Sequence, residues 1–365
     1  MQPWIRIAGL MLLFCSMYLI LWPVPVEPKA WKAPVSPGYT GEFTANDLLD
    51  EPIKLGLPEL HGPEAAAFDQ AGRLYLTTHE GWLVRSDQSG DVLEPWLDLG
   101  GRPLGLDIDQ NNTIWVANAY LGLQKVSPKG EVTVIANQAD GIPIRYADDV
   151  VVAPDGKVYF TDASTRFGAE EHYGTLEASL LDIMEHSDNG RVLVYDPKTQ
   201  LTTTILDGLT FANGVALGPQ GAYLLVVETG EYRVHKYWLA GARKGQTDVI
   251  IDNIPGFPDN IHAGRDGRFW IGLTAPRSPI LDRLAGKPGL RKVVQRLPAF
   301  MRPQVGLYGM VIGIDGDGNV VANLHSPSGN VYTTTGALES ETHLYVTSLT
   351  APFLAKYSKS DLGDL

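Results

Sequence analysis

Cysteine is nearly absent from this sequence. The single cysteine, Cys15, lies in an apolar run near the N-terminus. A chain with one cysteine forms no internal disulfide, and it lacks the C-x-x-C spacing of redox motifs and of many zinc sites. Cysteine usage therefore excludes a disulfide-stapled fold and leaves the cellular compartment open.

Several catalytic and nucleotide-binding signatures are missing as well. The sequence contains no G-x-x-x-x-G-K-[ST], no G-x-G-x-x-G that opens a helix, no G-x-S-x-G and no H-E-x-x-H. Hypotheses of a phosphate-cradling loop, a nucleophile elbow or a helix-borne zinc site therefore lose their main support.

Basic residues are in short supply. The 29 Lys and Arg residues are outnumbered by 42 Asp and Glu residues, which gives a net charge of −13. No basic patch interleaved with aromatic residues is present. We therefore expect neither nucleic acid nor an anionic membrane surface to bind the globular part, whereas a cation suits its charge.

Long stretches of helical periodicity are absent after residue 30, while 39 Gly and 25 Pro punctuate short apolar segments. Six segments share a turn with Gly, Asn or Asp followed by aromatic and β-branched residues, namely 71–76, 112–116, 155–160, 220–225, 266–271 and 317–321. Counted from the Gly or Asn of each turn, they follow one another after 40, 44, 65, 46 and 51 residues. This spacing is typical of propeller blades with one long insertion, and it predicts an all-β, six-bladed β-propeller over residues 50–365.

The long insertion falls between the third and fourth of these segments. Within it, Leu176, Leu180, Leu181 and Met184 are spaced three to four residues apart along the chain. This spacing predicts a short helix over 175–184. Such an insertion lies over one face of a propeller, either as a lid or binding loop or as a solvated excursion.

The N-terminus has a different composition. Residues 7–24 form a nearly unbroken apolar run, which follows Arg6 and precedes a proline-rich stretch. About 18 apolar residues suffice for a marginal membrane span, and the run ends without an A-x-A-like cleavage site. We therefore expect residues 1–24 to form an uncleaved transmembrane helix rather than a signal peptide, and residues 25–49 to form a stiff tether.

The charges beside the run indicate its orientation. Arg6 favours a cytoplasmic N-terminus, while Lys29 and Lys32 on the other flank favour the reverse. The sequence then predicts a single-pass, membrane-anchored protein with its propeller on the periplasmic or another extracytoplasmic side.

Four oxygen-bearing side chains stand at matched places in the repeat: Glu64, Asp148, Asn213 and Asp259 each lie eight residues before the turn glycine of their unit. This constant offset places them at the start of innermost strands, which line a propeller's central channel. Carboxylates and amides gathered there repel one another or stay unsatisfied unless a cation lies between them. An all-oxygen set suits calcium better than zinc, with magnesium or manganese as alternatives.

The densest motifs lie between Gly190 and Ile261. They are Tyr195-Asp196-Pro197-Lys198-Thr199, Phe211-Ala212-Asn213-Gly214-Val215-Ala216, Val227-Glu228-Thr229 and Pro258-Asp259-Asn260-Ile261. These runs closely resemble the signature of the strictosidine synthase-like family, and the resemblance covers about residues 60–356. The family belongs to a wider group of six-bladed calcium propellers that includes gluconolactonases, senescence marker protein 30 and paraoxonases.

Carried over position by position, the resemblance implies Glu64, Asn213 and Asp259 as metal ligands, with Asp148 where many relatives have Asn. Asp149 and Asn260 adjoin two of these residues and are expected to support them. Ala65 stands where paraoxonases have an Asp that helps to hold a second calcium. The sequence therefore predicts one calcium ion, in the central channel.

Two departures from the family pattern limit the chemistry. The stretch 331–336 has no acidic residue where the plant alkaloid enzyme that names the family depends on a glutamate, so a strictosidine synthase reaction is not expected. Leu104 stands where paraoxonases carry a catalytic histidine. A histidine-dyad mechanism is therefore not expected either.

The chemistry that remains is metal-assisted hydrolysis of lactones, aryl esters or related esters, in which the ion polarises the carbonyl and water is the nucleophile. The predicted proton acceptors are Asp259, Asp148 and His262. Further histidines near strand ends are alternatives, namely His61, His79 and His325.

Two aromatic residues are predicted to line the substrate pocket, Tyr120 and Phe167. Aromatic residues on propeller strands more often pack between sheets, so only these two are placed near the site. A hypothesis from another class remains open, because propellers also serve as binding scaffolds. In that case the metal stabilises the channel and the domain binds a partner without catalysis.

Overall fold

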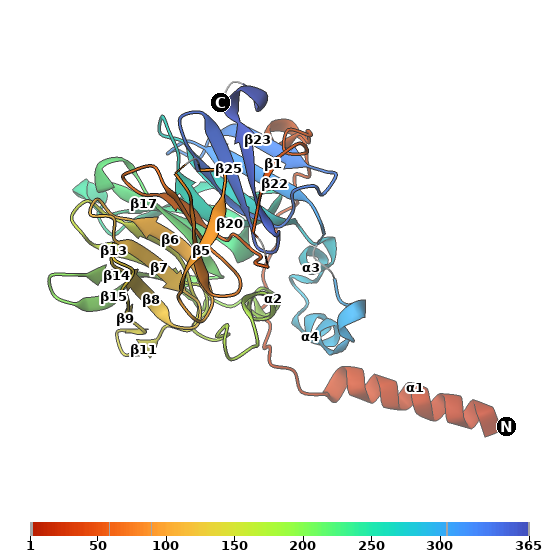
Figure 1. Ribbon diagram of the computed structural model, residues 1–365. Helices are drawn as coiled ribbons and strands as arrows, with labels where there is room; N and C mark the ends of the chain where they lie inside the picture. Colours follow the sequence, from red (N-terminus) through yellow and green to blue (C-terminus); the bar gives the residue numbers. More distant parts are fainter. Residues whose placement is uncertain (1–2, 58, 89, 304–305, 364–365) are drawn as a thin grey trace.

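Six four-stranded antiparallel sheets surround a common axis in the computed structural model (Figure 1), which describes residues 3–57, 59–88, 90–303 and 306–363. Short apolar segments separated by Gly, Asn and Asp turns form these sheets, because such turns reverse the chain tightly enough for neighbouring segments to pair. The all-β six-bladed propeller predicted from the sequence is confirmed.

The blades are numbered along the chain, with strands given from the axis outward. Blade 1 has β2 (Ala66–Phe68), β3 (Leu74–Thr77), β4 (Trp82–Ser86) and β5 (Leu93–Asp98); blade 2 has β6 (Pro103–Ile108), β7 (Ile114–Asn118), β8 (Gly122–Val126) and β9 (Val132–Ala136); blade 3 has β12 (Ala147–Val152), β13 (Val158–Asp162), β14 (Gly190–Asp196) and β15 (Leu201–Leu209). Blade 4 has β16 (Ala212–Leu217), β17 (Tyr223–Glu228), β18 (Arg233–Trp238) and β19 (Thr247–Ile251); blade 5 has β20 (Gly256–Ala263), β21 (Phe269–Pro276), β22 (Gly309–Ile314) and β23 (Val320–Ser326); blade 6 has β24 (Thr334–Glu339), β25 (His343–Ser348), β26 (Phe353–Ser358) and β1 (Ile53–Gly56). A small hairpin, β10 (Gln138–Ala139) and β11 (Ile142–Pro143), precedes blade 3.

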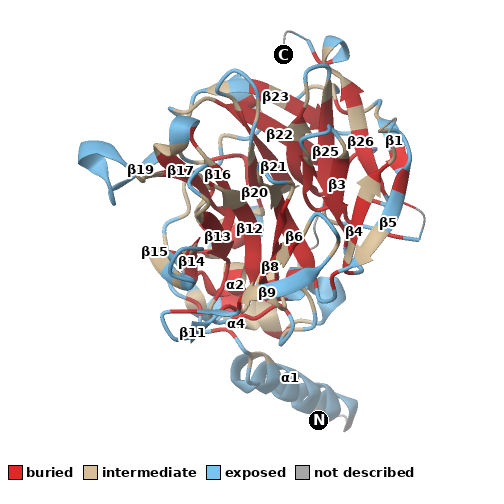
Figure 2. Cartoon of the chain, turned by 60° about the vertical axis from the view of Figure 1, so that its left-hand side comes forward, coloured by how far each residue is buried: buried red, intermediate tan, exposed pale blue. Residues whose placement is uncertain are grey.

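The ring closes through the two ends of the propeller sequence. Strand β1 pairs antiparallel with β26, with Ile53 opposite Lys356, so blade 6 takes its outer strand from the N-terminal side. The innermost strands β2, β6, β12, β16, β20 and β24 each contact the next one around the ring. Buried residues fill this centre (Figure 2), because the inner strands have sheets on both sides.

One of the six predicted repeat segments is assigned to the wrong blade. The segment 317–321 leads into β23, the outer strand of blade 5, whereas the other five lead into the second strand of a blade. The second strand of blade 6 is β25, which follows Glu341 and Thr342. Its turn lacks the glycine on which the pattern depends, so the hairpin around Gly318 was the better sequence match.

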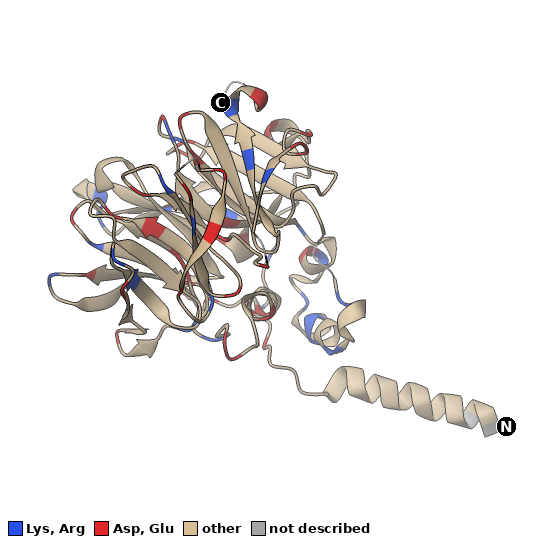
Figure 3. Ribbon diagram, in the orientation of Figure 1, with Lys and Arg blue, Asp and Glu red and all other residues tan. Residues whose placement is uncertain are grey.

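Helices occur in two insertions. Helix α2 (Thr175–Glu185) lies within blade 3 and confirms the short helix predicted there. Helices α3 (Pro279–Leu284) and α4 (Pro288–Arg296) lie between β21 and β22, and the sequence reading did not foresee them. Both begin with proline at the first helical position, where no backbone N–H is needed. Basic residues are concentrated on α4 (Figure 3).

The N-terminal apolar run forms helix α1 (Pro3–Leu21), which extends away from the blades (Figure 1). It ends before Pro23, because the residue before a proline is disfavoured in a helix, so the last residues of the run 7–24 are not helical. In the described part of the chain, no helix is both long enough and apolar enough to cross a membrane. The expected transmembrane helix is therefore not supported, and neither is the single-pass topology inferred from it.

The segment 25–49 runs along the propeller instead of standing away from it. The Lys29 and Trp31 N–H groups donate to the Glu185 and Ala285 carbonyls, and the Trp31 ring stacks on His186 at 3.8 Å. Val26 and Leu49 are completely buried. The segment thus joins the insertions of blades 3 and 5.

Candidate functional site

Five of the six innermost strands carry the same irregularity. In each, two residues face one residue of the second strand; the pairs are Leu104 and Gly105, Asp148 and Asp149, Asn213 and Gly214, Asp259 and Asn260, and Thr335 and Gly336. Blade 1 places Glu64 and Ala65 just before β2, where the Glu64 N–H donates to the Thr77 carbonyl. Two residues opposite one make a β-bulge, which redirects a side chain relative to the regular alternation.

The first residue of each pair defines a ring of six positions around the axis. Four of them hold the residues singled out by the eight-residue offset, and all four side chains are buried: Glu64, Asp148, Asn213 and Asp259. The other two positions hold Leu104 and Thr335. Leu104 replaces the paraoxonase histidine, and Thr335 lies in the stretch 331–336 that lacks an acidic residue. The Thr335 hydroxyl donates to the Glu64 carbonyl oxygen at 2.7 Å, which links blade 6 to blade 1.

Three carboxylates of this ring act on one another. Burial raises the pKa of Asp148, and the charges of Asp259 and Glu64 raise it further. Burial and the charge of Glu64 also raise the pKa of Asp259. Burial raises the pKa of Glu64 to about 7, against the opposing effect of Arg102. The ring therefore concentrates negative charge that the low dielectric of the interior disfavours.

Asp149 and Asn260 hold neighbouring blades together. The Asp149 carboxylate accepts hydrogen bonds from the Val150 N–H at 2.8 Å and from the Val215 N–H of blade 4 at 2.9 Å. The Asn260 amide donates to the Glu64 carbonyl at 3.2 Å. Both residues thus fix the strands that carry the ring, as a supporting role requires.

The donor set is mixed rather than purely acidic. Among the described residues, no three His, Cys, Asp or Glu side chains are gathered closely enough to hold a metal ion. The Oδ1 atoms of Asn213 and Asn260 add two oxygens, and both are buried without a hydrogen-bond partner in the described structure. A hard cation accepts carboxylate and amide oxygens alike and relieves both the orphaned oxygens and the repulsion. The residues therefore fit a calcium-like ion in their chemistry.

His262 lies on the same strand as Asp259, next to Gly336 of blade 6. Its Nε2 is buried and has no hydrogen-bond partner in the described part of the chain. Burial lowers the pKa of His262 to about 4. The imidazole is therefore neutral at pH 7.

The two aromatic residues predicted near the site belong to one apolar cluster. Phe167 is buried and Tyr120 partly buried, and both pack in the cluster that contains Leu104 of the ring. Tyr146 and Phe211 complete its aromatic part, with ring centroids 5.3 Å apart. The sequence reading missed Tyr146, although it precedes Asp148 by only two residues.

The most important omission is Arg102, which stands two residues before Leu104. Its side chain is 2% exposed, and Nη2 lies 3.4 Å from the Glu64 carboxylate. Its positive charge lowers the pKa of both Glu64 and Asp148. No spacing rule indicates such a residue, because its role depends on the approach of blades 1 and 2.

Helix α2 and the N-terminal segment cover this apolar cluster. Ala178, Leu181 and Met184 of α2 pack on it, as do Val24 and Val26. The Tyr146 hydroxyl donates to the Thr175 carbonyl at 2.9 Å, which ties the first turn of α2 to blade 3. The insertion predicted as a lid or as a solvated excursion thus packs over the end of the channel where the ring lies.

Asp182 of α2 provides a test of this packing. It is fully buried, and burial raises its pKa to about 7, with Glu185 raising it and Arg166 lowering it. An unfolded aspartate has a pKa near 3.9, so the stability that the protonated form provides is complete below about pH 4 and is lost as the pH rises through about 7. Asp182→Asn should therefore be more stable than wild type at pH 8, by at most about 4 kcal/mol.

Thermal unfolding at pH 4.5 and pH 8 measures this difference. Asp188→Asn, which changes an exposed aspartate of the same insertion, is the matched control and should leave the pH dependence unchanged. If Asp182→Asn exceeded wild type in stability by the same amount at both pH values, the conclusion that the Asp182 carboxyl is buried and protonated would be wrong.

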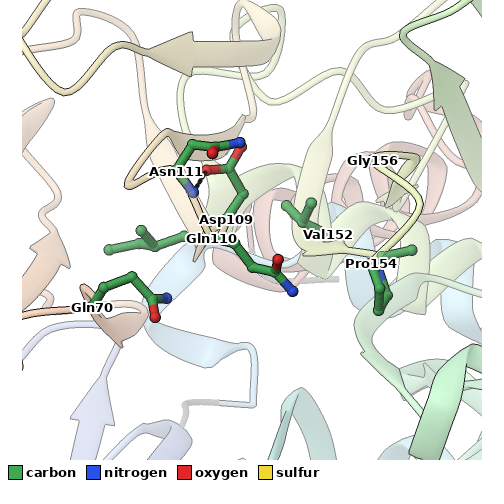
Figure 4. A pocket seen from close by; sticks show the side chains of 9 residues that line it. Gln70, Asp109, Gln110, Asn111, Val152, Pro154 and Gly156 are labelled. Atoms are coloured by element: carbon green, nitrogen blue, oxygen red, sulfur yellow. Dashed lines mark hydrogen bonds between the residues drawn. The ribbon is translucent and has the colours of Figure 1, made fainter.

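A shallow pocket lies at the other end of blades 1 to 3. Gln70, Asp109, Asn111, Val152 and Pro154 line it (Figure 4), at the C-terminal ends of strands β6 and β12. The ring residues lie at the N-terminal ends of the same strands. This pocket is therefore separate from the candidate site.

Sequence comparisons agree with this architecture. Two protein-family models match the sequence. The family described as strictosidine synthase matches residues 148–242, and the family described as strictosidine synthase-like, N-terminal, matches residues 41–86. The adipocyte plasma membrane-associated protein of Bos taurus is 33% identical over 93% of this chain and 86% of its own length. Protein STRICTOSIDINE SYNTHASE-LIKE 3 of Arabidopsis thaliana is 33% identical over 82% of this chain and 83% of its own.

Solved structures share the fold at low identity. A gluconolactonase from Xanthomonas campestris has a TM-score of 0.63 and 17% identity over 93% of this chain and 99% of its own. The calcium-binding protein regucalcin from Agrobacterium tumefaciens has a TM-score of 0.56 and 17% identity over 85% of this chain and 92% of its own. The bulged inner strands, the matching family models and the full-length relatives lead to one assignment: the chain belongs to the strictosidine synthase-like family.

Proposed function

We propose that this protein is a calcium-dependent hydrolase of lactones, aryl esters or related esters. The observation that carries the proposal is the group of three buried carboxylates, Glu64, Asp148 and Asp259, set at equivalent ring positions beside amide oxygens that lack hydrogen-bond partners in the described structure. Such a group is costly unless a cation binds it.

Four side chains would hold the ion, namely Glu64, Asp148, Asn213 and Asp259. The Asn260 side-chain oxygen is a further candidate ligand. When bound, calcium supplies a Lewis acid that polarises a carbonyl oxygen and stabilises negative charge in the transition state. The ring positions of Leu104 and Thr335 contribute no charge. Glu64 of blade 1 would therefore hold the ion from across the ring, opposite the adjacent ligands of blades 3, 4 and 5.

Asp148 and Asp259 are the proton acceptors in this proposal. Burial raises the pKa of both carboxylates, Asp259 and Glu64 raise that of Asp148 further, and Glu64 raises that of Asp259. The carboxylate oxygens that the ion leaves free would accept the proton of the attacking water. His262 is the third candidate acceptor, because burial lowers the pKa of its imidazole to about 4 and keeps it neutral. Thr335 and Asn260 keep the Glu64 backbone fixed while a proton moves.

The aromatic cluster suits an apolar acyl or aryl group. Tyr120, Tyr146 and Phe167 pack in one cluster with Leu104 of the ring, and α2 packs on the same cluster. Two proteins of the same fold, the gluconolactonase from Xanthomonas campestris and the calcium-binding regucalcin, support a lactone substrate and a calcium ion for this chain. A strictosidine synthase reaction is not proposed, because the last blade lacks the required glutamate.

Elemental analysis and a substrate panel test the proposal on the full chain. We expect calcium in the isolated protein, hydrolysis of at least one aryl ester or lactone, and loss of that activity with a chelator. Calcium at 100 times its dissociation constant should also stabilise the fold by about 2.7 kcal/mol. Zinc, or an unresponsive protein, would contradict the calcium site. Stabilisation by calcium with a fully inert panel would favour a binding scaffold instead.

A further inference from the structure

Arg102 has unused hydrogen-bonding capacity inside the protein. A guanidinium carries five N–H donors, and the one side-chain contact of this residue is the 3.4 Å approach of Nη2 to Glu64. Its Nε and Nη1 are buried and have no partner in the described structure. Since a buried unpaired donor destabilises a protein, these two nitrogens indicate a missing acceptor.

The backbone holds this arginine in place. The Arg102 N–H donates to Asn118 Oδ1 at 3.0 Å, and the Arg102 carbonyl accepts from the Ala119 N–H at 2.8 Å. Asn118 is itself fixed, because its amide donates to Gly100 and Gln124. The side chain is therefore positioned before any ligand binds, and less entropy is lost when one does.

The surroundings place Arg102 between the ring and the aromatic cluster. Its charge acts on Glu64 and Asp148 of the ring and on Tyr146 and Tyr120 of the cluster. A substrate whose carbonyl lies at the ring and whose apolar part lies against these aromatics would pass beside the guanidinium. An acceptor on that substrate could take the free N–H groups.

We infer that Arg102 is the recognition residue for a carboxylate on the substrate, so that the preferred substrates are esters or lactones bearing an acidic group. This inference rests on the proposed hydrolase function. A carboxylate pairs with a guanidinium through parallel hydrogen bonds. With three ring carboxylates and one divalent ion nearby, a single negative charge suits the site better than the double charge of a phosphate.

A matched pair of substrates tests the inference: 4-acetoxybenzoate carries the carboxylate, and 4-acetoxybenzamide replaces it with a neutral group of the same shape. Wild type should prefer the acid in kcat/KM. Arg102→Gln should lower the ratio of acid to amide by about 10-fold to 100-fold, as expected for a charge-assisted hydrogen bond in a buried site. Arg102→Lys should keep part of the preference, since it keeps the charge.

The ratio separates recognition from general damage, because loss of fold or of metal lowers both rates together. Arg243→Gln, in the exposed Arg243–Asp248 pair, controls for the loss of one positive charge and should leave the ratio unchanged. A ratio that Arg102→Gln leaves at the wild-type value would overturn the inference while the hydrolase function stands.

A binding measurement keeps the two proposals distinguishable. If wild type hydrolyses neither of these substrates nor any ester or lactone of the panel, the proposed function fails, and calorimetry with 4-hydroxybenzoate then decides the inference alone. Binding to wild type that Arg102→Gln weakens at least about 10-fold supports the carboxylate receptor. Absence of binding to wild type, or equal binding to Arg102→Gln, would overturn it.

Discussion

Replacing Asp259 with alanine should remove calcium from the protein and reduce ester hydrolysis to the uncatalysed background. The carboxylate is 7% exposed and lies at the bulge of β20, where burial and Glu64 raise its pKa. If calcium offsets this repulsion, its loss from the variant follows directly. Without calcium, the same reasoning predicts that Asp259→Ala does not lower the stability of the fold, because it removes a buried charge that the other ring carboxylates repel.

The expected signature therefore has two parts. In chelator, Asp259→Ala should unfold at a temperature equal to or above that of wild type, although the truncation leaves a small cavity. In excess calcium, only wild type should gain stability, by about 2.7 kcal/mol at 100 times its dissociation constant. Asp252→Ala, at an exposed aspartate seven residues earlier, is the control and should behave as wild type in both conditions.

Three measurements are needed: calcium content, melting temperature in chelator and in calcium, and kcat/KM with the best ester of the panel. A variant that binds calcium normally and retains activity would remove Asp259 from the site. A variant that loses calcium but keeps hydrolysis would separate the ion from the chemistry. That second outcome would transfer the catalytic role to residues outside the ring.

The position of the ring could be predicted from sequence because one geometric rule governs it. The eight-residue offset spans an inner strand and its turn, so it is the same wherever the bulge and the hairpin are the same. It located Glu64, Asp148, Asn213 and Asp259, all of which are buried at equivalent places. Periodicity inside each blade carries this information, since neighbouring strands are close in sequence.

Contacts between blades have no such signature. Arg102 and Tyr146 gain their roles from the approach of blades 1, 2 and 3, whose residues are about 40 positions apart along the chain. Blade 6 was misplaced for a related reason, because its second strand follows a turn without glycine. Helices α3 and α4 then remained hidden inside an interval that matched a blade length.

Amino-acid composition predicted the local conformation of the N-terminal residues better than it predicted their surroundings. An apolar run of suitable length predicts a helix, and α1 forms, but in the described chain no helix is both long enough and apolar enough to cross a membrane. Proline content predicts a stiff tether over 25–49, and residues 26–38 of that segment form neither helix nor strand. Composition did not indicate that Trp31 stacks on His186 or that Val26 is buried.

Gly214→Ala should destabilise the protein strongly, because the added methyl group has no room beside the ring. A Cβ at this position would lie 2.4 Å from the Ile261 nitrogen and 2.6 Å from the Asp259 carbonyl oxygen. Both are backbone atoms of β20, which cannot rotate away as a side chain can. The strand β16 must then move from β20, and we expect a destabilisation of about 3 kcal/mol, at the upper end for added core methyl groups.

The consequence for the site follows from the neighbours of Gly214. Asn213 precedes it at the ring, and the Val215 N–H that follows donates to Asp149. Separation of β16 from β20 would therefore displace a candidate ligand and break a link between blades 3 and 4. Calcium affinity should fall together with stability, although no ligand has been changed.

Denaturant unfolding in chelator and in calcium measures both effects. Gly56→Ala is the matched control, because a Cβ there meets no atom within 4 Å and alanine loses less entropy on folding than glycine. If Gly214→Ala were as stable as Gly56→Ala, the close approach of β16 and β20 would be wrong. If it lost stability but kept full calcium affinity, the ring would be held by its side chains rather than by the packing of the inner strands.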